Sequence, residues 1–315
     1  MRPLLLAAVL AAGPARAQEA PPDDKRWLVR PLFGVNELDL ELSDDNAPDL
    51  TYTPNSRLMM GARLGYRRFQ FSFTFSVPGT EEDPGRYGQS TTFDLQGATT
   101  FHARGHEWLL AGFFQSYRGF FLENTEELTP GAPPILYPEL DMAMLGGSLT
   151  FFTNPEFSYD ATFLDYRYRP RGMGSWAFRG TLGLMGFSNG GGASIIPVAA
   201  QARYPAVAAL NATGSLYTSA GVGYTRDWLF GRHGFLAGTL MLGPTFALQS
   251  YELNQVETRA FSVAPNAVVT AATGYIGDTF HGGLYANFEG DSTAIHGTTA
   301  LMLRIFVAAF VGARF

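Results

Sequence analysis

Leu301–Phe315 reads LMLRIFVAAFVGARF, and it alternates along its whole length as one extended strand would. Successive side chains of a β-strand point to opposite faces of the sheet. One face carries Arg304 and Arg314 among Met, Phe, Ala and Gly. The other is apolar at every position: Leu301, Leu303, Ile305, Val307, Ala309, Val311, Ala313 and Phe315. The stretch therefore predicts a strand that lays one wholly apolar face against a non-aqueous environment.

The composition restricts the classes of protein to which the chain can belong. Of its 315 residues 46% are hydrophobic and only 16% are charged, below the roughly 25% of ordinary soluble domains. Because there is no Cys, disulfides, thiolate metal sites and Cys nucleophiles are excluded. The 22 basic side chains against 28 acidic ones argue against nucleic acid as a partner, since phosphates require a basic surface.

The N-terminus has the pattern of an export signal. Arg2 precedes the apolar run Leu4–Ala12, and Ala15–Ala17 reads A-x-A, so residues 1–17 are expected to be a signal peptide. The polar residues 18–26 are expected to form a periplasmic lead-in, and 27–315 a single domain. No apolar stretch reaches the roughly twenty residues that a membrane-spanning helix needs. If the protein is embedded in a membrane, it must be a closed barrel.

Other segments repeat the alternation of the last strand. In Phe69–Val77 all four Phe share one face with Val77, whereas Gln70, Ser72 and Thr74 lie on the other. A helix would scatter these phenylalanines around its circumference, so a strand is predicted. The alternative is a soluble β-sandwich with the Phe face turned inward, but too little polar surface is left to solvate two sheets. Segments with the same pattern begin near Leu58, Phe93, Phe157, Trp176, Leu216 and Phe280.

The connections between these segments alternate in length, as short periplasmic turns and longer external loops do in outer-membrane barrels. Short ones are expected at Tyr66–Arg68, Ala103–Glu107, Thr153–Glu156, Phe230–Gly234 and Gly277–Asp278. Long ones are expected at Ser43–Asn55, Pro78–Gln89, Glu123–Glu139, Asn189–Gly214, Glu252–Ser262 and Glu289–Ala294. The pattern predicts an all-β antiparallel barrel of about twelve strands with both termini in the periplasm.

One region departs from this alternation. Between Phe157 and Phe187 two strand-like segments occur where the pattern allows one. Either Arg167–Gly174 interrupts one long excursion of the chain, or a turn elsewhere is misread.

Candidates for catalysis are few. Gly186–Gly190 reads GFSNG, and outer-membrane lipid hydrolases are similar in placing Asn after a nucleophilic Ser. Their general base is a His two residues before the Ser, a position that Gly186 fills here, so Ser188 lacks its base. The five His are scattered, and neither a metal site nor a cofactor is expected.

Arg167, Arg169, Arg171 and Arg179 form the one basic cluster of the sequence. Within the barrel they would make an anion-attracting constriction, because Arg binds carboxylate and phosphate bidentately. On a loop they would instead pair with Asp160, Asp165 or the phosphates of lipopolysaccharide.

Two resemblances extend this interpretation. The last strand resembles the C-terminal signal of bacterial outer-membrane barrels, so Val307, Ala309, Val311, Ala313 and Phe315 are expected to direct assembly. Several short strings also resemble a family of bacterial outer-membrane barrels known only as a domain of unknown function: Tyr52–Asn55, Thr92–Gln96, Gln115–Phe120, Asn154–Tyr159, Gly174–Ser175 and Gly223–Tyr224. This family implies a barrel fold and export and attaches no activity. Its members have a Lys/Gln-rich, Ser-Ala-Gly-Ser stretch where this chain has Arg169–Ser175.

The expected function is that of a non-enzymatic outer-membrane barrel, a narrow, porin-like pore or transporter or a surface structural protein. The alternative is an outer-membrane hydrolase of phospholipid or lipid A with Ser188 as nucleophile. The expected partners are outer-membrane lipids and lipopolysaccharide, periplasmic chaperones and the barrel-assembly machinery of a Gram-negative-type envelope.

Deleting Phe315, or replacing Val311 by Asp, is expected to block assembly and to leave export to the periplasm intact. Either change damages the apolar face of the terminal strand. Heat-modifiable gel mobility in outer-membrane fractions measures the assembled barrel. Normal amounts of heat-modifiable protein in both variants would contradict the assignment.

Overall fold

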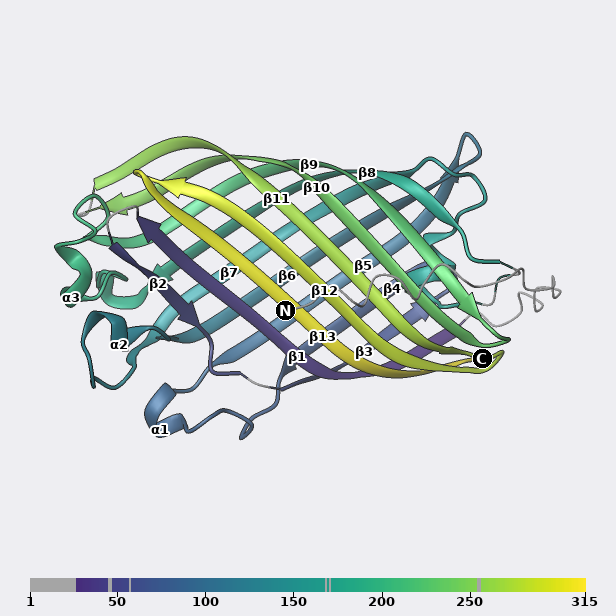
Figure 1. Ribbon diagram of the computed structural model, residues 1–315, viewed down its shortest axis with the longest axis horizontal. Coiled ribbons are helices and arrows are strands. Elements are labelled where there is room, and N and C mark those ends of the chain that lie inside the picture. The colour runs from purple at the N-terminus through teal and green to yellow at the C-terminus, as the bar shows by residue number, and fades with distance from the viewer. Residues whose placement is uncertain (1–26, 45–46, 57, 168, 170, 254–255) are drawn as a thin grey trace, which may run out of the picture.

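The computed structural model describes residues 27–44, 47–56, 58–167, 169, 171–253 and 256–315. The expected signal peptide, 1–17, and lead-in, 18–26, lie outside the described residues. The chain forms one antiparallel sheet of thirteen strands that closes on itself as a barrel (Figure 1). Its strands are β1 (Trp27–Asp44), β2 (Ala47–Thr53), β3 (Met59–Tyr66), β4 (Phe69–Ser76), β5 (Thr91–Ala103), β6 (His106–Leu122), β7 (Ile135–Phe152), β8 (Gly174–Asn189), β9 (Leu210–Phe230), β10 (Gly234–Leu253), β11 (Val256–Ile276), β12 (Phe280–Ile295) and β13 (Thr298–Arg314).

Twelve of these strands form a continuous circuit, as the sequence predicts. From β1 the circuit runs through β3 to β13 in chain order and returns to β1. The short strand β2 lies beside this circuit: it pairs with the end of β1 and, through Tyr52 and Thr53, with the end of β6. The stretch Ser43–Asn55 was expected to be a loop, and this expectation is wrong, because β2 bridges β1 and β6 beyond the ends of β3, β4 and β5.

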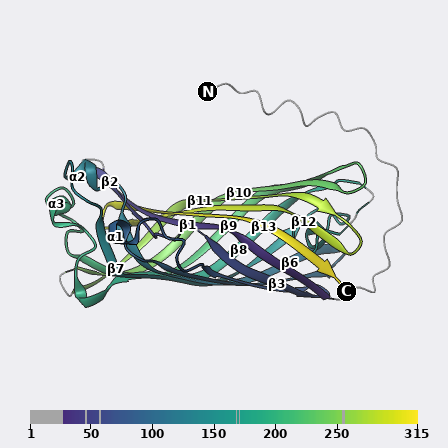
Figure 2. The same cartoon turned by 90° about the horizontal axis from the view of Figure 1, so that it is seen from below.

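Pairing of the first and last strands closes the sheet. β1 and β13 are in register from Leu28 opposite Arg314 to Ser43 opposite Thr299. At their ends Trp27 and Phe315 exchange two backbone hydrogen bonds, of 3.0 and 3.1 Å. The start of β1 and the C-terminus therefore lie side by side at one end of the barrel, which we call the termini end; the opposite end is the loop end (Figure 2).

The wall turns its apolar face outward. Phe69 and Phe71 are 66% and 45% exposed, whereas Gln70 and Ser72, which alternate with them, are buried in the lumen. In β13 the faces also divide as the sequence predicts, with Val311 outside and Arg314 inside. A soluble sandwich would bury the phenylalanines, so that alternative is excluded.

The connections differ in length between the two ends. At the termini end β3–β4, β5–β6, β9–β10 and β11–β12 are joined by two or three residues. Arg104 and Gly105 both have positive φ, 52° and 81°, as a tight hairpin turn requires. Longer loops at the loop end carry the short helices α1 (Pro84–Tyr87), α2 (Thr125–Leu128) and α3 (Val198–Gln201) and a 3₁₀ turn, Gly190–Gly192. No helix among the described residues is long and apolar enough to cross a membrane.

Three further predicted connections are wrong. β10 ends at Leu253 and β11 begins at Val256, and the stretch Glu289–Ala294 lies within β12, whose turn follows at 296–297. The third is the short turn at Thr153–Glu156: the link between β7 and β8 runs from 153 to 173 and contains a π-helical turn, Asp160–Leu164. The strand expected at Phe157–Phe163 therefore does not exist, and the alternative of one long excursion is correct.

Replacing Leu182 by Arg is expected to destabilise the barrel by about 2–4 kcal/mol in lipid, because Leu182 is 60% exposed on the outer face at mid-strand. Arg at Val198, which is 84% exposed in α3, is the matched control and should change little. Denaturant unfolding in vesicles measures both variants. Equal stability of the two would contradict a lipid-facing wall.

Candidate functional site

The middle of the barrel encloses a polar chamber of about 180 Å³. Its walls come from inward-facing positions of β1, β3–β8 and β10–β13, so the chamber spans the lumen. Its charged lining residues are Arg63, Asp94, Arg179, Glu289 and Arg304. Three arginines and two carboxylates at the centre of a barrel make this chamber the candidate functional site.

A charge network crosses one side of the chamber. Arg304 on β13 forms ion pairs with Glu289 at 2.9 Å and Asp291 at 3.2 Å, both on β12. Its Nη1 donates to Gln115 Oε1 on β6 at 3.0 Å. Arg179 on β8 reaches Glu289 at 3.9 Å. Three side chains therefore bind Arg304, whereas among the described residues Arg179 has a single, longer ion pair.

Arg63 and Asp94 are not part of this charge network. The side-chain amides of Gln96 and Gln115 both donate to Asp94 Oδ2, at 3.0 and 2.9 Å. Within the described residues Asp94 Oδ1 is buried and has no hydrogen-bond partner. Arg63 makes no hydrogen bond or ion pair with any described residue, and its guanidinium lies 5.9 Å from the Tyr285 ring centroid. The chamber thus contains a cation and a carboxylate oxygen that the protein leaves available.

Between the chamber and the termini end, the lumen is filled by the link between β7 and β8. We call residues 153–167, 169 and 171–173 the plug. Phe157 packs with inward-facing Leu109, Ala177 and Met241, and Phe163 packs with a second cluster that includes Leu32 of β1 and Phe310 of β13. Because the plug contacts inward residues of several strands, it occupies the termini end of the lumen.

A buried carboxylate anchors the start of the plug. Glu107 on β6 is 1% exposed and accepts hydrogen bonds from Ser158 Oγ at 3.1 Å and from the backbone N–H groups of Tyr159 and Asp160. A carboxylate is stabilised at a helix N-terminus, where backbone N–H groups lack intrahelical partners. Glu107 therefore fixes the π-helical turn to the wall.

Two inward-facing arginines anchor the middle of the plug. Arg314 donates to Asp165 Oδ1 at 2.9 Å and to the carbonyl oxygen of Tyr166 at 2.7 Å. Arg30 donates to the carbonyl oxygen of Leu164 at 2.8 Å and lies 4.7 Å from the Tyr166 ring centroid. Arg314 belongs to the terminal strand, so the strand that closes the barrel also holds the plug.

A buried ion pair anchors the end of the plug. Asp227 on β9 is fully buried; it pairs with Arg169 at 2.9 Å and accepts from the N–H of Met173 at 2.8 Å. Removing one member of such a pair leaves an uncompensated buried charge, which is strongly destabilising. The plug is thus attached to the wall at three separated points.

The two buried acidic side chains of the plug, Asp160 and Asp165, have opposite pKa shifts. Burial acts to raise the pKa of Asp165, but the guanidinium groups of Arg314 and Arg167 outweigh burial and hold it below its usual value. Burial raises the pKa of Asp160 to about 7, and the nearby Asp165 and Glu107 add to this shift. Among the described residues Asp160 Oδ1 has no hydrogen-bond partner, so protonation relieves an unpaired charge.

The structure separates the arginines that the sequence groups together. Arg167 pairs with Asp165, Arg169 with Asp227, and Arg171 with Glu156 at 2.5 Å on the exposed rim. Only Arg179 lines the chamber. The first three hold the plug together and to the wall.

Ser188 lies outside the lumen. It is exposed on the outer face of β8, opposite Asp141 on β7 and Ala212 on β9. No hydrogen bond within the described chain connects it to a His. This arrangement lacks the base that a Ser nucleophile requires.

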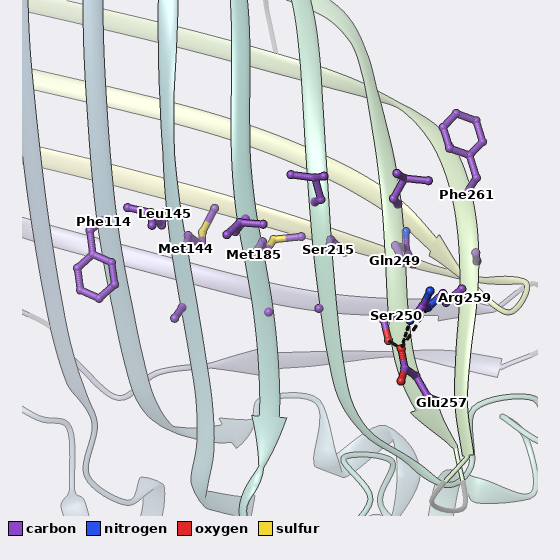
Figure 3. A pocket seen from close by; sticks show the side chains of 17 residues that line it. Phe114, Met144, Leu145, Met185, Ser215, Gln249, Ser250, Glu257, Arg259 and Phe261 are labelled. Atoms are coloured by element: carbon purple, nitrogen blue, oxygen red, sulfur yellow. Dashed lines mark hydrogen bonds and ion pairs between the residues drawn. The ribbon is translucent and has the colours of Figure 1, made fainter.

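A trough of about 840 Å³ lies on the outer surface across β6–β11 (Figure 3). Small residues line its floor, and Leu145, Leu184 and Leu248 form one edge. Glu257 accepts from Ser250 Oγ at 2.8 Å and pairs with Arg259 at 3.3 Å. The trough belongs to the apolar outer surface and is separate from the chamber.

The loop end is closed by apolar packing. The segment 190–209, which we call the lid, buries Ile195, Ile196 and Tyr204 among inward-facing residues of the wall. The Tyr204 hydroxyl donates to the carbonyl oxygens of Leu42 at 3.0 Å and Pro48 at 2.7 Å. The chamber therefore lies between a lid packed by apolar contacts and a plug held largely by charged groups.

Four residues of the site were not predicted from the sequence as site residues: Arg63, Asp94, Glu107 and Asp227. Glu107 and Asp227 meet their partners in the plug, and Arg63 and Asp94 come together only in the closed lumen. A sequence without a known register does not show which residues meet. The available signal was a charged residue at an inward position of an alternating strand. Asp94 in Phe93–Phe101 and Arg63 in Leu58–Tyr66 both fit that description.

Comparison with known proteins places the chain in a family. The family model described as "Domain of unknown function (DUF4421)" matches residues 30–315. No curated protein matches the sequence.

Several solved structures resemble the fold at low similarity. The outer membrane protease OmpT from Escherichia coli has 8% identity and a TM-score of 0.39, with 95% of this chain and 99% of that chain covered. The Pseudomonas putida toluene transporter TodX has 10% identity and a TM-score of 0.33, with coverage of 93% and 91%. A Pseudomonas aeruginosa FadL homologue has 10% identity and a TM-score of 0.31, with coverage of 93% and 90%.

Asp160 is expected to make stability depend on pH. Its folded pKa of about 7 lies above the ordinary value of 3.8, so the unfolded chain loses this proton first. Stability should fall as pH rises from about 4 to about 7 and remain lower above that range, by roughly 4 kcal/mol at most. Asp160→Asn should remove this slope when denaturant midpoints are measured against pH. Glu156→Gln, an exposed change in the same segment, should retain it; an unchanged slope in Asp160→Asn would contradict the assignment.

Proposed function

The chain belongs to the DUF4421 family, and from the geometry of its barrel we propose that it is a non-enzymatic outer-membrane protein, a gated narrow conduit for small polar solutes. At rest the plug and the lid close it. One observation carries the proposal. The barrel wall is apolar on its outer face and polar at the middle of its lumen, and there it surrounds a chamber that the anchored plug bounds.

The outer surface supports a place in the membrane. Leu145, Leu184 and Leu216 are directly paired on neighbouring strands and all are more than 45% exposed, so apolar side chains form a continuous band. Aromatic pairs lie near the termini end, Trp27 with Tyr66 at 4.7 Å and Trp176 with Tyr224 at 5.5 Å. Apolar bands bordered by aromatic girdles are typical of transmembrane barrels.

The lengths of the connections support one orientation of the barrel in the membrane. Transmembrane barrels have short periplasmic turns and longer extracellular loops. Four of the five termini-end connections here have two or three residues. At the loop end β10–β11 and β12–β13 are also joined by two residues, but the links 77–90, 123–134 and 190–209 are much longer and carry α1, α2, α3 and the lid. We therefore place both termini in the periplasm and the lid outside the cell, where the loop end would meet lipopolysaccharide.

The plug supports gating. Its two ends continue into β7 and β8, so the segment can leave the lumen without any break in the wall. Side chains anchor it through Glu107, Arg314 and Asp227, and none of its described residues belongs to a strand of the sheet. Loss of these contacts would release the plug and connect the chamber with the periplasm.

Replacing Glu107 by Gln is expected to release the plug more often. Hydrogen bonds to a charged group contribute about 1.5–3 kcal/mol, so the open population should rise roughly 10- to 100-fold. Planar-bilayer recording should show rare openings in the natural protein and frequent ones in Glu107→Gln. Asp227→Asn should act in the same direction.

Asp141→Asn, which changes an exposed acidic residue on the outer face, is the matched control and should behave like the natural protein. Replacing residues 156–172 by a short Gly-Ser turn tests the conduit directly. If that variant assembles and stays silent, the barrel is not a conduit and a surface structural role takes its place.

A further inference from the structure

We propose that the central chamber is a binding site for a small zwitterionic solute of amino-acid size. The inference rests on the proposed conduit and names the class of solute for which the conduit is built. Arg63 binds the carboxylate of the solute, and Asp94 binds its ammonium group.

Arg63 supplies the free cation. It projects inward from β3 and lines the chamber, and Leu64 and Tyr66 of the same strand point outward. Across the described chain no carboxylate lies within ion-pair distance of its guanidinium. Its neighbour is the Tyr285 ring, a weak cation–π contact at 5.9 Å that leaves the planar donor fork available.

Asp94 supplies the free acceptor. It is 4% exposed and lines the same chamber from β5. The two glutamine amides bind Oδ2 alone, and in the described part of the chain Oδ1 is buried with no donor. A buried acceptor without a donor is costly, and an ammonium group that reaches it recovers this cost.

The register sets the spacing of the two groups. Arg63 is opposite Ser72 on β4, Ser72 is opposite Gln96 on β5, and Asp94 lies two residues from Gln96 on the same face. Two strand spacings and two residues separate the Cα atoms of Arg63 and Asp94 by about 12 Å. Both side chains line the chamber and no ion pair joins them, so the two charged groups face the same space without neutralising each other, which suits a zwitterion.

The size and the remaining charges restrict the solute further. At about 180 Å³ the chamber is below the roughly 300–1,000 Å³ of pockets for drug-sized ligands. Glu289 and Arg304 already satisfy each other at 2.9 Å. A neutral sugar would leave both Arg63 and Asp94 uncompensated, and an anion or a cation alone would leave one of them. Only a molecule with both charges satisfies both groups.

Equilibrium dialysis of the refolded full-length barrel with radiolabelled probes tests the site. The probes are L-alanine, N-acetyl-L-alanine with a carboxylate only, L-alaninamide with an ammonium only, and glucose with neither. L-Alanine should bind at one per barrel, and each other probe should bind at least about 10-fold more weakly, as expected for loss of a charged hydrogen bond. This comparison needs no variant.

Arg63→Gln and Asp94→Asn provide the diagnostic signatures. Arg63→Gln should bind L-alanine no better than L-alaninamide, and Asp94→Asn should bind it no better than N-acetyl-L-alanine. Arg118→Gln and Asp141→Asn, which alter an exposed Arg–Asp pair on the outer wall, are the controls and should bind as the natural protein does. Heat-modifiable mobility confirms that each variant is folded.

Dialysis is repeated with Glu107→Gln, so that slow entry into the closed barrel is not mistaken for absence of a site. Lack of L-alanine binding in both proteins, or equal binding of glucose, would overturn the inference. Conductance in the plug variants without L-alanine binding would reject the site and leave the conduit. Selective binding without conductance in any variant would reject the conduit and leave the site.

Discussion

Hydrogen bonding between β1 and β13 is the interaction on which the rest of the structure depends. A sheet in hydrocarbon cannot leave edge N–H and C=O groups unpaired, since each unsatisfied group costs several kcal/mol. The register from Leu28–Arg314 to Ser43–Thr299 removes both edges at once. Only after closure do the alternating strands acquire an outside and an inside. The apolar band and the polar chamber are two consequences of the same pairing.

A closed circuit of twelve strands encloses more space than its own side chains fill. The chain occupies that space with segments from its connections, the plug at the termini end and the lid at the loop end. The means of attachment differ. Tyr204 and its neighbours join the apolar core of the loop end, whereas Glu107, Arg314 and Asp227 bind the plug through charge. Buried charges require partners, so these charged contacts fix the position of the plug. The stability of the docked plug therefore depends on a few contacts.

The sequence predicts the wall well because strand alternation is local. The outward face of Phe69–Val77, the two faces of β13 and the circuit of about twelve strands are all confirmed. Alternation also explains the main error. Phe157, Tyr159 and Phe163 repeat at strand spacing, but they are buried within the lumen as part of the plug. Periodicity shows that side chains are buried on one face and does not show what they are buried against. The roles of Glu107, Asp227, Arg63 and Asp94 depend on which residues the closed barrel brings together, and local patterns do not contain this information.

The central claim is that the chamber is closed at both ends while the barrel is at rest, and a single introduced cysteine tests it most directly. The chain has no Cys of its own, so Ser72→Cys reports on the chamber wall alone. Its reaction with a membrane-impermeant thiol reagent is compared with that of Glu126→Cys, a position exposed at the loop end. The account predicts that the Ser72 site reacts far more slowly in the otherwise natural barrel and accelerates when Glu107→Gln is added. Equal rates at the two sites in the natural barrel would contradict it.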